Sequence, residues 1–143
     1  MEIINIILLN GQFSILKNYI TANNFPWFYK TDYFSHIFYQ AHAPKSDGFN
    51  CIIPLLDELK VNALMDASVL LLPSTYGTFG IELESNSKAA LIFLYSCNGY
   101  VLHKEEKEAC EENKGMLFNE KNKYTIFSQT DVKKNIMLVL NYY

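Results

Sequence analysis

Apolar residues recur along this chain in two spacings, which separate the expected helices from the expected strands. In residues 12–22 they fall at every third or fourth position, as on an amphipathic helix, and residues 52–64 repeat the pattern. The isoleucine-rich run 2–9 instead predicts a buried strand, closed by the turn pair Asn10-Gly11. Two helices are therefore expected, both in the first half of the chain.

Short runs of strand-forming residues dominate the remainder. An aromatic tract over residues 27–39, broken by Thr31-Asp32, suits two short strands and a turn, and its rings are expected to fill the core. We expect Asn86-Ser87 to form a hairpin turn, and the end of the chain to be a strand although Thr130-Asp131 could cap a helix. The further strands are expected at residues 69–72, 80–84, 89–95, 116–118, 124–127 and 136–142.

The charged stretch 102–114 permits two interpretations. Its lysines and glutamates have the spacing of helical salt bridges, but few apolar residues form a stripe that could anchor a helix. A charged hairpin between two strands is the alternative. In either case the run is expected to be a solvated surface.

Length and composition indicate one packed domain spanning residues 1–143. The chain has 143 residues, of which 50% are hydrophobic and 15% aromatic, so it can bury a core without disulfides or metals. Together with the expected elements, this predicts an α+β, mainly β, fold. Cys51, Cys97 and Cys110 lack the spacing of zinc ligands and are expected to be free thiols in a reducing, cytoplasmic compartment.

The charge pattern argues against nucleic acid and membrane as partners. The net charge is −3 and all twelve basic residues are lysine, so the arginine fork that grips phosphates and guanine edges is absent. A lysine-only composition could equally reflect an AT-rich genome. The apolar run 3–9 is too short to span a bilayer, and Glu2 stands where a signal peptide would carry positive charge.

Six segments, taken in order, resemble the small prolyl-hydroxylase-like members of the iron(II) and 2-oxoglutarate dependent oxygenases, especially the short forms of phage genomes. The resemblance covers nearly the whole chain and implies a double-stranded β-helix, also called a jelly roll or cupin-like fold, with two flanking helices. The segments are Asn24-Phe25-Pro26-Trp27-Phe28-Tyr29, Phe34-Ser35-His36-Ile37-Phe38-Tyr39, Ile53-Pro54-Leu55-Leu56-Asp57-Glu58-Leu59, Asn98-Gly99-Tyr100, residues 113–119 and residues 139–143.

The resemblance also implies where iron ligands would stand. The family holds iron with a His-x-Asp pair and a distal histidine, and these positions correspond to Gly80-Ile81-Glu82 and Tyr124. Glycine offers no ligand and tyrosine is an uncommon one, so the triad is absent. Glu82 could be a surface carboxylate or keep a pocket role, whereas Tyr124 is expected to be a core aromatic.

Other positions are assigned by the same resemblance. Asp66, Ser68 and Leu70 are expected to face the pocket. A basic residue that pairs with the far carboxylate of 2-oxoglutarate could only be Lys133 or Lys134. With its triad missing, the protein is expected to bind no iron, and no cofactor unless an atypical oxygenase activity holds.

Three functions remain open. The leading hypothesis is a non-catalytic binding protein, a pseudoenzyme that keeps an oxygenase-like scaffold and binds an unknown protein or small molecule. The second is a 2-oxoglutarate-dependent dioxygenase with atypical ligands, in which His36, His42 or His103 acts with Glu82 or Asp66. The third is an inhibitor or immunity module that meets a basic partner through the acidic run 105–112. A homodimer through free sheet edges is compatible with each.

Overall fold

The computed structural model describes residues 1–74, 80–119 and 121–143, and within them it contains two helices and twelve strands. The helices are α1 (Asn10–Thr21) and α2 (Phe49–Glu58). The strands are β1 (Glu2–Ile4), β2 (Phe28–Lys30), β3 (Tyr33–Gln40), β4 (Ala43–Pro44), β5 (Leu64–Pro73), β6 (Gly80–Ser85), β7 (Lys88–Phe93), β8 (Tyr100–His103), β9 (Glu106–Ala109), β10 (Gly115–Phe118), β11 (Asn122–Phe127) and β12 (Lys134–Tyr142).

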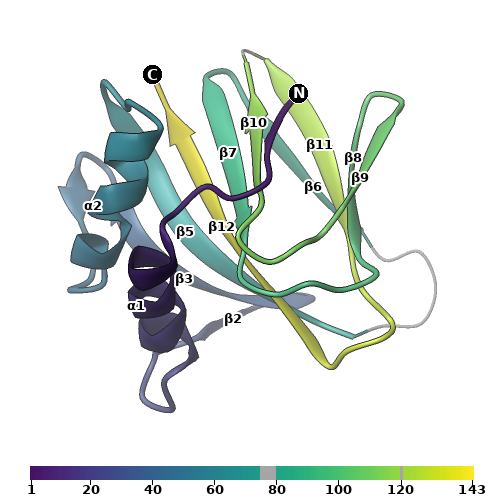
Figure 1. Cartoon of the computed structure of the whole chain (residues 1–143), viewed down its shortest axis with the longest axis horizontal. Coiled ribbons are helices and arrows are strands. Elements are labelled where there is room, and N and C mark those ends of the chain that lie inside the picture. Colours follow the sequence, from purple (N-terminus) through teal and green to yellow (C-terminus); the bar gives the residue numbers. More distant parts are fainter. Residues whose placement is uncertain (75–79, 120) are drawn as a thin grey trace.

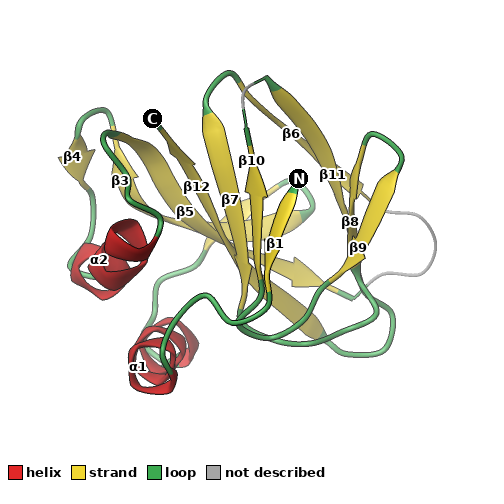
Figure 2. Ribbon diagram, turned by 45° about the horizontal axis from the view of Figure 1, so that its top comes forward, coloured by secondary structure: helices red, strands yellow, loops and turns green. Residues whose placement is uncertain are grey.

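These strands form two antiparallel sheets. The large sheet has the order β1-β10-β7-β12-β5-β3-β2, with β4 paired to β3, and the small sheet has the order β6-β11-β8-β9. Both helices lie on one side of the large sheet and the small sheet lies on the other (Figure 1). Viewed from a second direction, the two sheets converge toward one end of the molecule, with the helices outside them (Figure 2).

The path of the chain between the sheets defines the fold. From β5 to β12 the chain alternates between them, with only β8 and β9 adjacent in one sheet. Apart from the β8–β9 hairpin, these strands therefore pair with partners distant in sequence, as β12 does with β5 and β7. This is the topology of a double-stranded β-helix, and it confirms the predicted fold class.

Strand alternation divides the core of the protein into two apolar layers. On β5, Ala67 and Val69 face the helices and pack with the α1 and α2 side chains, whereas Leu70 and Leu72 face the small sheet. The helices contribute Leu16, Ile20, Ile52 and Leu55 to the first layer, all fully buried. The second layer fills the space between the sheets and forms the floor of the site described below.

Most predicted elements are present, and the largest difference lies at the start of the chain. The expected strand 2–9 is paired only over β1, because its partner β10 begins at Gly115. Beyond that point Asn113 takes over the pairing. Its main-chain oxygen accepts from the Ile7 N–H at 3.0 Å, and its side chain exchanges hydrogen bonds with the main chain of Leu8 at 3.1 and 2.9 Å.

One expected hairpin turn is absent, and the charged stretch is resolved as a hairpin. Asn86-Ser87 is not a hairpin turn, because β6 pairs with β11 while β7 pairs with β10 and β12, so the turn carries the chain from one sheet to the other. The charged stretch 102–114 contains the β8–β9 hairpin rather than a helix. Lys104, in its turn, adopts a left-handed φ of 55°. In the described part of the chain, neither helix has the length and apolarity to cross a bilayer.

Candidate functional site

A pocket opens between the two sheets, on the face of the large sheet that points away from the helices. Its volume is about 210 Å³, and its walls come from β3, β5 and β12, with one residue of β6 closing the opposite side. The lining residues are Tyr33, Ser35, Ile37, Tyr39, Gln40, Asp66, Ala67, Ser68, Leu70, Leu83, Val139 and Asn141. Polar groups thus gather on the large sheet above an apolar floor.

Two irregularities in strand pairing shape this wall. The β5–β12 register shifts between Asn141 and Tyr142, which leaves Met65 as an extra residue on β5. The β3–β5 register shifts between Ile37 and Tyr39, which leaves Phe38 as an extra residue on β3. Bulges of this kind bend a strand and re-aim neighbouring side chains, and they are frequent beside binding sites. Here Met65 directly precedes Asp66 on β5, and Phe38 lies on the neighbouring strand β3 beside Ala67 and Ser68.

Asp66 is the acidic group of the pocket. The Asn141 Nδ2 donates a hydrogen bond of 2.7 Å to the Asp66 Oδ1, which fixes the carboxylate against the wall. Burial raises the pKa of Asp66, and the hydrogen bond from Asn141 only partly opposes this effect. None of the salt bridges between described residues includes Asp66. The pocket therefore contains a half-buried carboxylate without a cation beside it.

Asn141 holds Asp66 in the pocket wall. Its own Oδ1 is buried and has no hydrogen-bond partner among the described residues. A buried polar atom normally has a partner, so this oxygen is an exception, and it is shielded by protein atoms from the open part of the pocket. Asn141 was not among the residues expected in the pocket. The signal available in the sequence was a single amide following the apolar run Met137–Leu140.

The structure brings together three of the residues expected to face the pocket. Asp66, Ser68 and Leu70 all line it, because they alternate along β5 on the face opposite Ala67 and Val69. Leu70 is almost fully buried, whereas Asp66 and Ser68 are partly accessible. They form one wall of the pocket.

Gly80 and Glu82 are placed differently from the expectation that they line the pocket. The Glu82 side chain is 64% exposed and pairs with the Lys123 ammonium at 3.2 Å, on the outer face of the small sheet. A Cβ on Gly80 would meet the Thr125 Cγ2, also on that face. The side chains that point between the sheets from β6 are Ile81 and Leu83. The inward-facing positions of β6 are thus one residue away from those that the resemblance assigned to the pocket, and a shift of one residue exchanges the two faces of a strand.

Tyr124 points between the sheets and is almost fully buried. It lies opposite Leu83 on β6 and His103 on β8, and its ring stacks on Phe118 with centroids 4.7 Å apart and planes 12° apart. Burial, and to a smaller extent the charge of Asp66, raises the pKa of its phenol. The residue thus occupies the position of a core aromatic.

These side chains do not fit an iron(II) centre. Ile81, Leu83 and Tyr124 project inward from the two strands to which the resemblance assigned the iron ligands, and none supplies an imidazole or carboxylate. Across the described ranges, no three histidine, cysteine, aspartate or glutamate side chains gather closely enough to hold a metal.

The three histidines lie far from one another in the fold. His36 faces the helices, with its ring nitrogens at 2.9 Å from the Pro26 oxygen and 2.8 Å from the Ser46 hydroxyl. His42 is exposed in the β3–β4 turn, and His103 packs edge-on against Phe118 at 5.0 Å. His42 lines a hollow with Asp66, but no second histidine lines it, so the atypical ligand set proposed from the sequence is not assembled among the described residues.

Lys133 and Lys134 do not reach the pocket. Both are exposed and line a separate hollow with Tyr95, Ser96 and Val132. At this end of β12 the buried side chain is Asn135, whose Nδ2 lies 3.6 Å from the Cys110 sulfur. Neither lysine can therefore neutralise the carboxylate of a ligand bound in the pocket that Asp66 lines.

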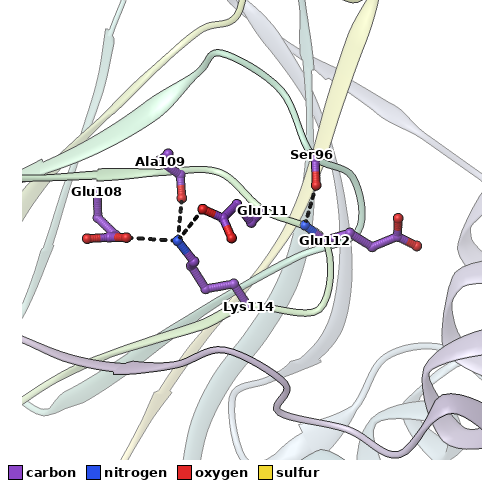
Figure 3. A network of polar contacts seen from close by, with 6 residues as sticks. All are labelled: Ser96, Glu108, Ala109, Glu111, Glu112 and Lys114. Carbon is purple, nitrogen blue, oxygen red and sulfur yellow. Dashed lines mark hydrogen bonds and ion pairs between the residues drawn. The ribbon is translucent and has the colours of Figure 1, made fainter.

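The acidic run 105–112 is partly neutralised within the chain (Figure 3). The Lys114 ammonium lies 2.8 Å from Glu108 and 3.0 Å from Glu111, and donates to the Ala109 oxygen at 3.3 Å. Burial lowers the pKa of Lys114, but its two glutamate partners outweigh that effect and raise it. Lys17 pairs with Glu112 at 2.7 Å. Three of the five glutamates in the run thus have an internal cation.

Comparison with known proteins agrees with this fold. No protein-family model and no curated protein matches the sequence. Among solved structures, a 2OG-Fe(II) oxygenase family oxidoreductase of Burkholderia pseudomallei has a TM-score of 0.63 at 8% identity, over 92% of this chain and 76% of that one. A cupin superfamily protein of Desulfitobacterium hafniense has a TM-score of 0.53 at 9% identity, over 80% and 81%. KdgF of Halomonas sp. has 0.51 at 8%, over 82% and 87%. The chain therefore shares a cupin and oxygenase-like fold, and identities this low carry no function.

Proposed function

We propose that this protein is a non-catalytic binding protein, a pseudoenzyme on a 2-oxoglutarate oxygenase-like scaffold, which holds a small molecule in the pocket between β3, β5 and β12. The observation that carries the proposal is the set of inward-facing side chains Ile81, Leu83 and Tyr124. They stand on the strands that bear the ligands in iron-dependent relatives of this fold, and they offer one phenol and no imidazole. A degenerate member of the prolyl-hydroxylase-like group is the more specific form of the same proposal.

The charge of the pocket supports the proposal independently. 2-Oxoglutarate is a dianion, and enzymes that use it supply a metal and a basic side chain to neutralise it. Here the pocket wall carries Asp66 and includes no lysine, so a dianion would enter against an uncompensated negative charge. The same wall is otherwise well suited to a small ligand, because convergent polar groups surround an apolar floor.

A cosubstrate assay tests this function. The protein is incubated with iron(II) and 2-oxoglutarate, succinate release is measured, and 2-oxoglutarate binding is followed by calorimetry. We expect neither turnover nor saturable binding. The Asp66→Asn variant is the matched control for the charge of the pocket, because it removes the negative charge that repels 2-oxoglutarate and keeps an oxygen that accepts from the Asn141 Nδ2. Succinate formation by the wild-type protein would refute the proposal.

The two alternatives have weaker support. An oxygenase with atypical ligands needs two histidines near a carboxylate, and His36, His42 and His103 lie on separate parts of the described structure. An inhibitor acting through the acidic run 105–112 needs free negative charge, and Glu108, Glu111 and Glu112 already pair with lysines. Copurification from the native host with one tightly bound basic protein would favour the inhibitor over the pocket.

A further inference from the structure

We propose that the ligand of this pocket is a small organic cation, bound through its ammonium group by Asp66 and the hydroxyls of Ser35 and Ser68. This inference rests on the proposed function, since it names the chemical class that a non-catalytic pocket would hold. It goes beyond that function because the sign of the ligand's charge does not follow from the fold or from the missing iron ligands.

The Asp66 carboxylate has no cation paired with it among the described residues. A carboxylate that leaves water loses hydration, and proteins normally offset this loss with a cation or several hydrogen-bond donors. Asp66 is partly buried, and Asn141 is the one side chain among the described residues that donates to it. The titratable groups that line this pocket with Asp66 are the phenols of Tyr33 and Tyr39, and Tyr124 lies behind it. His42 and the C-terminal Tyr143 line a second hollow with Asp66, but His42 forms no salt bridge with it.

The acceptor oxygens of the pocket match the hydrogen-bonding needs of an ammonium group. An alkylammonium has three N–H donors and no acceptor, so it needs several oxygens around one point. The pocket offers the Asp66 carboxylate and the hydroxyls of Ser35 and Ser68. The Asn141 amide fixes the carboxylate, because its Nδ2 donates to the Asp66 Oδ1 and leaves the Oδ2 without a side-chain partner among the described residues.

The apolar part of the pocket suits the remainder of the ligand. Leu70, Leu83 and Val139 provide an apolar floor, and the volume of about 210 Å³ fits a short chain rather than a bulky ring system. Tyr33 and Tyr39 line the pocket as well, and aromatic faces attract cations in addition to packing against methylene groups. A short alkyl chain carrying one ammonium group satisfies both ends of the site.

A charge series of equal-sized probes tests the inference. Isotope-labelled protein is titrated by NMR at neutral pH with butylammonium, 1-butanol and butyrate. We expect saturable shifts of the Asp66, Ser68 and Asn141 amide signals with butylammonium, and binding at least about tenfold weaker for the other two. Asp66→Asn should weaken butylammonium by about tenfold or more. Asp57→Asn, on the exposed face of α2, is the matched control and should leave the affinity unchanged.

The outcomes separate the two levels of the proposal. Equal affinity for butylammonium and 1-butanol, or an unaltered affinity in Asp66→Asn, overturns the cation while leaving a non-catalytic binding pocket in place. Failure of all three probes to shift the pocket signals also overturns it. Succinate release in the cosubstrate assay refutes the proposed function itself, whatever the probes do.

Discussion

Tyr124 stacks on Phe118, with ring centroids 4.7 Å apart and planes inclined by only 12°. The pair bridges β11 and β10, and therefore joins the small sheet to the large one across the space between them. Both residues are almost fully buried. The inward face of β11 is thus part of the core, and packing accounts for Tyr124 without a chemical role.

This packing predicts a large loss of stability on truncation. We expect Tyr124→Ala to lower the free energy of unfolding by about 3–5 kcal/mol, as for other buried aromatic side chains. Tyr124→Phe keeps the stacked ring and should cost less than about 1.5 kcal/mol. Urea denaturation followed by fluorescence measures both. A loss below about 1 kcal/mol in Tyr124→Ala would show that the ring does not hold the sheets together.

The carboxylate of Asp66 should cost the empty protein stability. Because burial raises its pKa in the folded state, the ionised form is less favourable there than in the unfolded chain. We expect Asp66→Asn to raise the free energy of unfolding at pH 7 by up to about 1 kcal/mol, since part of the group remains solvated. The variant should gain this stability while losing the proposed cation.

The same reasoning fixes the pH dependence of that gain. Below the unfolded pKa of 3.8 the carboxyl is protonated in both states, so the difference between Asp66→Asn and wild type should vanish there. The stability difference should grow as the pH rises from the unfolded pKa to the raised folded pKa, and it should stay constant above that. Parallel denaturant titrations from pH 3 to pH 7 measure it, and a destabilised variant at pH 7 would contradict the account.

Lys114 offers a test of the β8–β9 hairpin. Its side chain is only 3% exposed, while its partners Glu108 and Glu111 are 31% and 60% exposed. Because both glutamates can return to water, we expect Lys114→Met to cost about 1–3 kcal/mol, less than breaking a fully buried pair. Lys134→Met removes an exposed lysine and should change stability by less than about 0.5 kcal/mol. Equal effects in thermal or urea unfolding would exclude a structural role for the ion pairs.

Stability should fall in alkali. Burial raises the pKa of Tyr124 and Tyr142. The unfolded chain therefore releases these protons first, from about pH 10, so the unfolding free energy decreases as the pH rises. Tyr124→Phe should flatten part of this decline. A stability that is constant between pH 9 and pH 11 would contradict it.

Sequence patterns recovered most of the helices and strands because periodicity and turn residues are local signals, whereas the double-stranded β-helix was implied only by the resemblance. The spacing of Phe13, Leu16 and Ile20 predicted α1, and Thr31-Asp32 correctly separated β2 from β3. The pairing of strands is not local. Asn86-Ser87 has the composition of a hairpin turn, but long-range pairing of β6 with β11 makes it a crossing between sheets. Similarly, β1 ends early because β10, more than a hundred residues away, begins at Gly115.

The candidate site was recovered in part for the same reason. Alternation along β5 was enough to place Asp66, Ser68 and Leu70 on one face. On β6, the alternation of Ile81 and Leu83 with Glu82 and Glu84 indicates which side chains point inward, and it disagrees with the pocket positions that the resemblance assigned to Gly80 and Glu82. The bulges at Met65 and Phe38, and the meeting of Asp66 with Asn141, depend on three strands brought together by the fold.

The most direct test of the central claim is whether a divalent metal ion enters the space between the sheets. Manganese(II) added in stoichiometric amount broadens NMR signals near its site, and it occupies the same oxygen and nitrogen sites as iron(II). We expect no selective broadening of the amide signals of Leu83 and Tyr124. Saturable broadening centred on these two residues would show that the space holds a metal after all, and would contradict the account of a pocket without iron chemistry.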